Sequence, residues 1–405
     1  HRAFVPGETS IPLQAPSYGH EEVIEVLDSL LSTNVTMGKK VHLFEEAFAE
    51  YLGVKHAVMV NSGSSANLVA LSVLTNDQLP NRIMPGEEII VPATLWTTTI
   101  NPIGDVGAVP VVVDVELGTM NIDPAKVEEA VNEKTRAIMP VHLLGNPAKI
   151  KEITRIATEH NLFIIEDTCE AHGAMVGNKK VGTFGDIGTF SFFFSHHIST
   201  IEGGMVVTDN DEYAELARAL RAFGWARNLK KYESYAAQYP QIDKRFLFVN
   251  KGFNLRPTEL QGAMGMHQIK KLEKHIAGRR QNAAYWITRL RRFSGFLILH
   301  EEREGTRHVW FGQPLTVKDN APFTRDELVE YLEEHRIETR PVLVPNIEQQ
   351  PYAKMIKHRV HGELRNAQYI ADHSFFLGNH QQIGKQEREY VADVIADFIK
   401  RKARQ

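Results

Sequence analysis

Hydrophobic and polar positions alternate regularly along residues 1–250, where short apolar runs are separated by amphipathic stretches. Apolar runs of about four to eight residues are typical of buried strands, and apolar positions that recur every three or four residues are typical of helices. This alternation predicts βαβ units around a mixed, mostly parallel sheet. The expected strands are Ala57–Val60, Glu88–Val91, Val109–Val115, Ala137–Val141, Leu162–Glu166, Thr189–Phe194 and Met205–Thr208.

Helical periodicity fills several of the gaps between these strands. Apolar positions from Leu43 to Leu52 recur at helical spacing, and Gly53 follows as a C-terminal stop. Further helices are expected at Pro147–His160 and Glu212–Ala222.

The pattern changes near residue 260. A long helical pattern from Thr258 to about Phe293 leads into a section that mixes strands and helices. Its expected strands are Leu297–His300, Trp310–Thr316 and Glu338–Pro341, and its expected helices are Thr324–His335 and Lys385–Arg401. We therefore predict a large α/β domain over residues 1–260 and a smaller C-terminal α+β domain over residues 261–405.

Composition is that of a globular protein and removes several classes of function. Of the 405 residues 43% are hydrophobic and 24% are charged, and the formal net charge of −4 gives no argument for nucleic acid or an anionic membrane as partner. No apolar run approaches the roughly 18–20 residues of a membrane span, and the first residues lack the apolar core of a signal peptide. We therefore expect a cytoplasmic protein. The lone Cys169 excludes a disulfide within the chain and an iron–sulfur cluster held by four of its thiolates.

A turn rich in glycine and serine, Asn61–Asn67, follows the first expected strand and opens a helix. The N-terminus of a helix exposes backbone N–H groups at the positive end of its dipole, which suits a phosphate group. An ordinary strand-to-helix turn with serine caps explains the same residues. Both interpretations stay open on this turn alone.

An acidic pair, Glu166-Asp167, stands where the expected strand 162–166 ends. Open α/β sheets place their ligands at the carboxyl ends of strands, and a carboxylate there can pair with a cationic ring nitrogen. Capping of a following helix explains Asp167 equally well. Cys169 fits a small buried side chain better than a nucleophile, because no base is tied to it.

The most informative stretch runs from Gly182 to Met205, where a strand ends in Ser195-His196-His197 and a Gly-Gly turn opens the next strand. Adjacent histidines rarely bind one metal ion together, and no cluster of carboxylates or cysteines supports a metal site. A histidine base that reaches into a pocket explains the stretch better, because an imidazole with an ordinary pKa of about 6.5 transfers protons in both directions. We therefore expect no metal and a catalytic His196.

Taken together and in this order, these stretches resemble the sugar aminotransferase family of the aspartate aminotransferase fold, the fold type I enzymes that depend on pyridoxal phosphate. The resemblance runs nearly end to end. It also rests on Thr36-Met37-Gly38, Val91-Pro92-Ala93, Pro140-Val141-His142-Leu143-Leu144-Gly145 and Gly252-Phe253-Asn254-Leu255-Arg256. It implies that the large domain binds the cofactor and that the protein is a homodimer with active sites shared between subunits.

The resemblance assigns cofactor contacts to particular residues. Gly63 and Ser64 would give backbone N–H groups, and Ser191 its hydroxyl group, to the cofactor phosphate. Asn254 would reach that phosphate from the neighbouring subunit.

Around the cofactor ring, the resemblance places Trp96 in stacking contact with the pyridine. Asp167 would pair with the ring nitrogen and keep it protonated, so that the ring can act as an electron sink. Glu170 falls where relatives often carry Gln or Ser near the cofactor's 3-hydroxyl group.

One position departs from the aminotransferases and determines the expected reaction. In them the Phe-Ser-Phe segment is followed by a lysine that forms a Schiff base with the cofactor, whereas this chain has His196 and no lysine between Lys180 and Lys230. Imidazole forms no stable Schiff base, so we expect the cofactor to bind non-covalently, as pyridoxamine phosphate. The substitution resembles the branch of pyridoxamine-dependent 3-dehydratases of nucleotide-linked 4-keto-6-deoxy-hexoses, in the version without an iron–sulfur cluster.

This branch implies dehydration at C3 of the sugar, with GDP-4-keto-6-deoxy-mannose as the expected substrate, in the synthesis of dideoxysugars such as colitose for the O-antigen. His196 is expected to remove a proton as a base and then to protonate the departing C3 hydroxyl group. L-glutamate is the expected amino donor, with Arg256 as the partner of its carboxylate and Arg227 near the sugar substrate. Either arginine could instead belong to a structural ion pair, His197 could only orient the loop, and Glu202 could only cap it.

Two other functions stay open on the sequence: a nucleotide-sugar aminotransferase that turns over without its lysine, and a non-catalytic cofactor-binding protein on the same scaffold. Retention of Asp167 and Ser191 together with His196 favours an enzyme. The sequence leaves open the nucleotide, the sugar stereochemistry, assembly beyond a dimer and the role of residues 230–249.

Overall fold

A sheet of eight strands forms the centre of the computed structural model, which describes residues 4–404. In spatial order its strands are β1 (His56–Val60), β9 (Gly204–Thr208), β8 (Ile187–Ser191), β5 (Phe163–Asp167), β4 (Thr135–Ile138), β2 (Glu88–Pro92), β3 (Val109–Val113) and β14 (Arg359–Val360). Every neighbouring pair is parallel except the two pairs that β9 makes with β1 and β8. This mixed, mostly parallel sheet confirms the predicted fold class.

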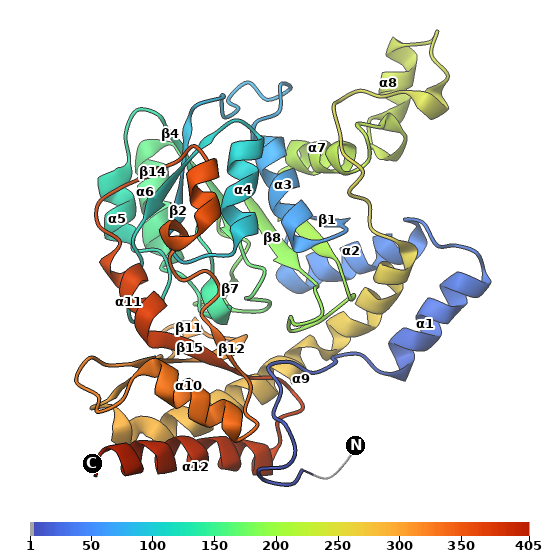
Figure 1. Ribbon diagram of the computed structural model, residues 1–405. Helices are drawn as coiled ribbons and strands as arrows, with labels where there is room; N and C mark the ends of the chain where they lie inside the picture. The colour runs from blue at the N-terminus through green and yellow to red at the C-terminus, as the bar shows by residue number, and fades with distance from the viewer. Residues whose placement is uncertain (1–3, 405) are drawn as a thin grey trace.

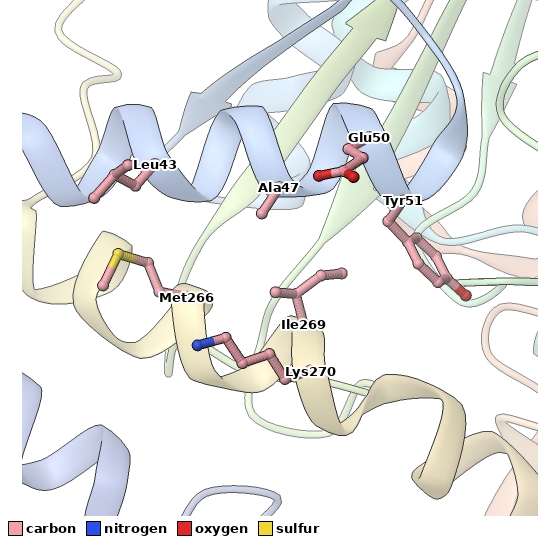
Figure 2. A pocket seen from close by; sticks show the side chains of 7 residues that line it. All are labelled: Leu43, Ala47, Glu50, Tyr51, Met266, Ile269 and Lys270. Atoms are coloured by element: carbon pink, nitrogen blue, oxygen red, sulfur yellow. The ribbon is translucent and has the colours of Figure 1, made fainter.

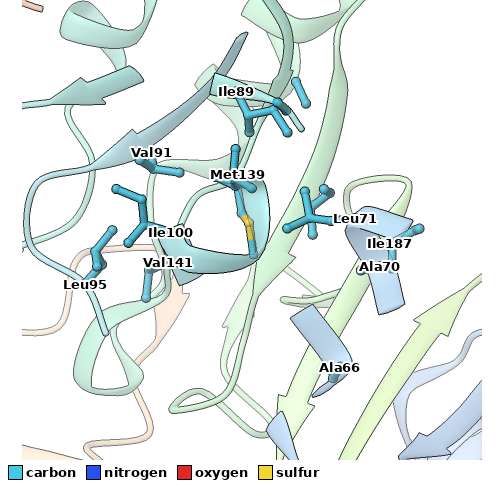
Figure 3. Packing of buried hydrophobic residues seen from close by; sticks show 14 of the residues in the cluster. Ala66, Ala70, Leu71, Ile89, Val91, Leu95, Ile100, Met139, Val141 and Ile187 are labelled. Carbon is cyan, nitrogen blue, oxygen red and sulfur yellow. The ribbon is translucent and has the colours of Figure 1, made fainter. Parts of the chain in front are cut away.

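Helices cover both faces of this sheet, because its strands are apolar on both sides. On β2, Ile89 and Val91 pack into a cluster with α3 (Gly63–Leu74). Ile90 between them packs into a second cluster with α5 (Pro124–Ala130) and α6 (Ile150–His160). Successive side chains of a strand point to opposite faces, so one apolar run serves two helix layers. Figure 3 shows Leu71 of α3 and Met139, which follows β4, in the first cluster.

The helices around the sheet follow the predicted periodicity. They are α2 (Lys39–Leu52), α3 (Gly63–Leu74), α4 (Thr97–Asp105), α5 (Pro124–Ala130), α6 (Ile150–His160) and α7 (Asp211–Arg221). Gly53 ends α2 with a φ of +79°, the left-handed conformation that glycine adopts most easily. The predicted stop at this residue is confirmed.

The C-terminal part begins with α9 (Glu259–Leu290), whose start is closed by a capping box between Thr258 and Gln261. A second, antiparallel sheet follows in the order β10 (Leu297–Leu299), β12 (Gly312–Val317), β15 (Ser374–Gly378) and β13 (Thr339–Pro341). Its apolar cluster includes residues of α9, α10 (Arg325–Glu334) and α12 (Lys385–Lys402), which lie together beneath the sheet in Figure 1. Helix α11 (Arg365–His373) precedes β15.

Two segments extend away from this body in Figure 1: α1 (His20–Leu31) and an arm that carries α8 (Tyr232–Gln238). A small sheet joins β6 (Met175–Val176) to β7 (Lys179–Lys180) and β11 (Thr306–Arg307). Within residues 4–404, none of the helices combines the length and the apolar character needed to span a bilayer.

Several predicted boundaries were wrong. β8 ends at Ser191 instead of Phe194, because the chain leaves the sheet there to form a loop. β12 begins at Gly312 instead of Trp310, because Trp310 has a left-handed φ of +51° that does not fit a strand. The central strand β15 was missed. The domain division at residue 260 stays a prediction, and one strand from beyond it, β14, pairs with β3 in the large sheet.

Candidate active site

Three chain segments meet at one edge of the large sheet. β1 leads through Ser62 into α3, β5 ends at Asp167, and β8 ends at Ser191. β1, β5 and β8 run in the same direction, because the reversed strand β9 lies between β1 and β8. The carboxyl ends of such strands are the usual ligand-binding edge of an open α/β sheet.

Gly63, the first residue of α3, lies directly against Ser191. A Cβ atom on Gly63 would lie 2.5 Å from the Cβ atom of Ser191 and 2.9 Å from its Oγ, so this approach requires glycine. Ser62 caps the helix by accepting the N–H of Ser65 at 3.1 Å. The N–H groups of Gly63 and Ser64 belong to the first helical turn, where the helix itself offers no acceptor. The start of α3 therefore lies against the hydroxyl group of Ser191, and unbonded N–H groups beside a hydroxyl group suit a phosphate.

The buried carboxylate of Asp167 is held in one orientation. Asn67 of α3 donates from Nδ2 to Oδ2 at 2.9 Å, and the hydroxyl group of Thr99 donates to the same oxygen at 2.8 Å. The N–H of Cys169 donates to Oδ1 at 3.2 Å. All three partners are neutral, so the negative charge of this carboxylate is left to pair with a cation such as a protonated ring nitrogen.

Sequence reasoning missed the residues that hold Asp167. Asn67 receives a hydrogen bond in turn, because the hydroxyl group of Thr189 donates to its Oδ1 at 2.6 Å. All of these groups are buried. The available signal was Asn67 itself, a polar residue among the apolar positions of the helix after the glycine-rich turn.

The other half of the acidic pair, Glu166, is a structural residue. Its carboxylate accepts hydrogen bonds from Nε2 of His142 at 3.0 Å and from the N–H groups of Gly182, Phe184 and Gly185 at 2.6–2.8 Å. Glu166 and His142 are completely buried. Four donors therefore satisfy this carboxylate, and it fixes the turn that precedes β8.

Glu170 lies three residues after Asp167 and is also buried. Its Oε2 accepts the N–H of Leu144 at 2.7 Å. Burial first, and the neighbouring charge of Asp167 in addition, raise the pKa of Glu170 to about 8, so its carboxyl group is protonated at neutral pH. Burial and Asp167 also raise the pKa of the Cys169 thiol, which makes it a poor nucleophile.

His196 lies on the loop of residues 192–203 that joins β8 to β9. The N–H of Phe192 donates to the carbonyl of Gly203 at 2.8 Å, and the N–H of Thr200 donates to the carbonyl of Phe192 at 2.9 Å. These bonds close the loop near both of its ends. Backbone hydrogen bonds therefore fix the loop that carries His196.

The second histidine of the pair, His197, supports this loop. It is completely buried, and its Nε2 donates to the carbonyl of Val309 at 3.0 Å. Its own carbonyl accepts from Nδ1 of His275 at 3.0 Å. These contacts agree with the expected orienting role, which stays a prediction.

The imidazole of His196 is half-buried among other rings. Its centroid lies 5.2 Å from the ring of Phe311 and 6.0 Å from that of His172. Nδ1 is buried and has no hydrogen-bond partner within residues 4–404. Burial, and then the positive charge of Arg279, lower the pKa of His196 to about 3, so the ring is neutral at physiological pH.

Three other predicted residues are more exposed. Trp96 directly precedes α4 and is 53% exposed. Arg256 donates from Nε to Oδ1 of Asn254 at 3.2 Å. The carbonyl of Leu255 between them accepts the N–H of Asn61 at 3.0 Å, so this segment borders the glycine-rich turn of its own chain.

Arg227 and Glu202 make none of the side-chain contacts described above for the sheet edge. The guanidinium group of Arg227 is exposed and lies 4.5 Å from the ring centre of Trp225. The side chain of Glu202 is exposed, and its carbonyl accepts from the hydroxyl group of Thr200 at 2.7 Å. No group of three or more histidine, cysteine, aspartate or glutamate residues that could hold a metal ion occurs between residues 4 and 404.

Comparisons with known proteins agree with this geometry. The sequence pattern of the DegT/DnrJ/EryC1/StrS aminotransferase family matches residues 16–396. The GDP-4-keto-6-deoxy-D-mannose 3-dehydratase of Yersinia pseudotuberculosis is 40% identical over 375 residues, which cover 92% of this chain and 94% of that protein.

Two solved structures are similarly close. A mutant GDP-4-keto-6-deoxymannose-3-dehydratase with bound GDP-perosamine superimposes with a TM-score of 0.90 at 38% identity, over 95% of this chain and 99% of that one. The same dehydratase with a trapped PLP-glutamate geminal diamine gives a TM-score of 0.88 at 37% identity, over 95% and 99% of the two chains. The chain therefore belongs to the DegT/DnrJ/EryC1/StrS aminotransferase family.

Proposed function

We propose that this enzyme uses pyridoxal phosphate and its amine form, pyridoxamine phosphate, to remove the C3 hydroxyl group of a nucleotide-linked 4-keto-6-deoxy-hexose. GDP-4-keto-6-deoxy-mannose is the proposed substrate, L-glutamate the amino donor, and dideoxysugar and O-antigen synthesis the proposed context. The observation that carries this proposal is His196, a neutral imidazole on the loop after β8, where the aminotransferases have a lysine. The names of the similar dehydratases support it.

The residues at the sheet edge fit this cofactor. The cradle between Gly63 and Ser191 suits its phosphate, and the carboxylate of Asp167, with neutral partners only, suits its ring nitrogen. When bound, the cofactor supplies an amino group for the sugar ketone and an electron sink for the charge that develops beside it. The residues that we propose to contact it are Gly63, Ser64, Trp96, Asp167, Glu170 and Ser191, together with Asn254 from the neighbouring subunit of the proposed homodimer.

His196 is proposed to move the proton. Because Nδ1 is buried, Nε2 is the nitrogen that can face a bound substrate. A neutral imidazole accepts a proton there, and the imidazolium that forms is a strong acid, because its surroundings disfavour the charge. It can then pass the proton to the departing C3 oxygen. Positioned acid–base catalysis of this kind contributes roughly 10²–10⁴-fold.

The arginines are proposed to bind the anionic groups. The guanidinium group of Arg256 lies 4.7 Å from the ring centre of Phe223 and bonds to Asn254. The carbonyl of the preceding residue, Leu255, accepts from Asn61 of the glycine-rich turn. We assign Arg256 to the carboxylate of L-glutamate. Arg227, stacked on Trp225, is assigned to the nucleotide-linked sugar.

A homodimer with shared active sites is also proposed. Apolar side chains of α1 are exposed, among them Ile24 at 61% and Leu31 at 85%. Figure 2 shows a groove between α2 and α9 whose lining includes Leu43 and Ile269. Extended apolar surface of this kind is typical of a protein interface. We assign it to a second copy of this chain, and the double substitution Ile24→Glu, Leu31→Glu should produce monomers in light scattering.

A product assay tests the proposed reaction. The protein would be incubated with pyridoxal phosphate, L-glutamate and GDP-, CDP- or dTDP-linked 4-keto-6-deoxy-hexoses, and the products read by mass spectrometry. We expect release of ammonia and loss of one oxygen with the GDP sugar. An amino sugar would instead establish an aminotransferase, and no turnover with any sugar would favour a binding protein.

Borohydride gives an independent test of the resting protein. With no amine at position 196, we expect reduction to leave every peptide free of covalently attached pyridoxal phosphate. The variant His196→Lys is the matched control, which should be labelled at that position. Labelling of the unmodified protein at a lysine of the site would overturn the proposal. The cytoplasmic location expected from the sequence stays a prediction.

A further inference from the structure

Arg279 of α9 is a buried guanidinium group whose partners are backbone carbonyls. It is 3% exposed, and burial lowers its pKa to about 9. Nη1 donates to the carbonyl of Phe311 at 2.8 Å, to that of Asn379, and at 3.5 Å to that of Trp310. Within residues 4–404 no carboxylate pairs with it, and its Nε has no partner. Burying a positive charge without a carboxylate partner costs free energy, which only its hydrogen bonds to the backbone offset.

Two of the carbonyls held by Arg279, those of Trp310 and Phe311, belong to a strained crossing of the chain segments 143–145 and 309–311. Trp310 has a φ of +51°, and Leu144 in the facing segment also has a φ of +51°. The N–H of Phe311 donates to the carbonyl of Leu144 at 2.9 Å, and the N–H of Val309 donates to that of Gly145 at 3.0 Å. Left-handed conformations of non-glycine residues are unfavourable and persist only where neighbouring contacts fix them.

The same crossing touches three side chains of the candidate active site. The N–H of Leu144 holds the carboxyl group of Glu170. The carbonyl of Val309 accepts from His197, and the ring of Phe311 lies 5.2 Å from that of His196. A shift of this crossing would therefore move the acid–base residue and its neighbours together.

Close packing makes the crossing sensitive to small displacements. A Cβ atom on Gly145 would lie 2.9 Å from the backbone nitrogen of Trp310, so the two segments are already at contact distance. The ring of Trp310 stacks on that of His308 with centroids 3.7 Å apart. Arg279 donates hydrogen bonds to the carbonyls of Trp310, the residue with the left-handed φ, and of Phe311, which follows it.

We propose that Arg279 is a positioning residue for the reaction: by holding the carbonyls of Trp310 and Phe311, it fixes the crossing that orients His196 and Glu170. The role of His196 and Glu170 in catalysis rests on the proposed function. The contact chain from Arg279 to His196 rests on geometry alone, so the two can be tested separately.

The experiment compares Arg279→Gln, which removes the charge and the paired donors, with Arg279→Lys, which keeps the charge but loses the planar fork. The control is Arg289→Gln, on the same helix but in an exposed ion pair with Asp393. In the complete protein loaded with pyridoxamine phosphate, we expect kcat for the GDP sugar to fall about 100-fold in Arg279→Gln, with KM changed less than about threefold. Arg279→Lys should recover part of this loss, and the control should match the unmodified protein.

A second readout does not depend on turnover. Diethylpyrocarbonate acylates neutral imidazole, and peptide mass spectrometry gives its rate at His196. We expect this rate to rise by about threefold or more in Arg279→Gln, because the ring loses its fixed neighbour Phe311. Unchanged labelling and unchanged kcat in both variants would overturn the proposal, and Arg279→Lys alone decides it if Arg279→Gln does not fold. If the unmodified protein dehydrates no sugar, the proposed function fails, while the labelling still decides whether Arg279 positions His196.

Discussion

Glu166 and His196 are polar residues near the same sheet edge, but their hydrogen bonding differs. The carboxylate of Glu166 accepts from four protein donors. Nδ1 of His196 has no partner within residues 4–404, and neither ring nitrogen of the adjacent His172 has one. A fully bonded polar group stabilises the backbone around it, whereas an unbonded one weakens the fold and can react. Glu166 therefore belongs to the part of the site that holds its shape, and His196 to the part that we propose to handle protons.

The largest expected effect concerns activity at the proton-handling side. His196→Ala should lower kcat for dehydration by about 10²–10⁴-fold, because it removes the group that we propose to move the proton. Stability should change by less than about 1 kcal/mol, since Nδ1 makes no protein hydrogen bond. Steady-state kinetics and urea unfolding measure the two quantities. A large loss of stability with little loss of activity would show that His196 supports the fold and does not transfer the proton.

Glu170, with its one hydrogen bond from Leu144, lies between the two extremes. Its pKa is raised from 4.5 to about 8, so the stability that its protonated form contributes is present below pH 4.5 and is lost as pH rises through 8. The substitution Glu170→Gln, which stays neutral, should gain stability relative to the unmodified protein by roughly 5 kcal/mol across this range. Urea unfolding at several pH values measures it, and parallel curves for the two proteins would contradict the assignment.

At the shape-holding side, Glu166→Gln should destabilise the fold by about 3 kcal/mol. The neutral amide is a weaker acceptor for four donors and places an NH₂ group against one of them. Glu128→Gln, in an exposed ion pair with Arg155, is the control and should leave stability unchanged. Equal urea midpoints for the two variants would show that the turn before β8 does not depend on this carboxylate.

The smallest effect is expected at His172, whose neighbours are aromatic rings including Phe48 and Phe190. Burial lowers the pKa of His172, so the fold loses stability as pH falls below the ordinary histidine value of about 6.5. His172→Phe should raise stability by about 1 kcal/mol at pH 7.5, and by more at pH 5.5. Melting curves at the two pH values test this. A destabilised variant would indicate that the imidazole has a structural role after all.

Much of the site follows from the sequence because it depends on strand ends. An apolar run that stops at a polar residue marks the edge of a parallel sheet, and so Asp167 and the glycine-rich turn of residues 61–67 could be expected there. Ser191 was assigned by the family resemblance alone, because the expected strand continued to Phe194. The strand β15 was missed because Ser374–Gly378 is short and follows the helical pattern of α11 without a clear turn signal.

The supporting residues could not be predicted in the same way. Thr99 reaches Asp167 across 68 positions, and Arg279 reaches the carbonyl of Asn379 across 100 positions. The partners of Arg279 are backbone carbonyls. Every residue has one, so the sequence carries no signal for them. Periodicity reports which face of an element is buried, and it does not report which buried polar groups meet.

The loop of residues 192–203 has one further consequence. Its closure depends on Phe192, Thr200 and Gly203, whose hydrogen bonds come from the backbone. The residue at position 196 therefore contributes little to the loop's shape, and imidazole or amine can be carried there on the same backbone. Enzymes with unlike reactions can then share nearly identical overall structures. Within such a group, the identity of this single side chain is a better guide to chemistry than the degree of structural overlap.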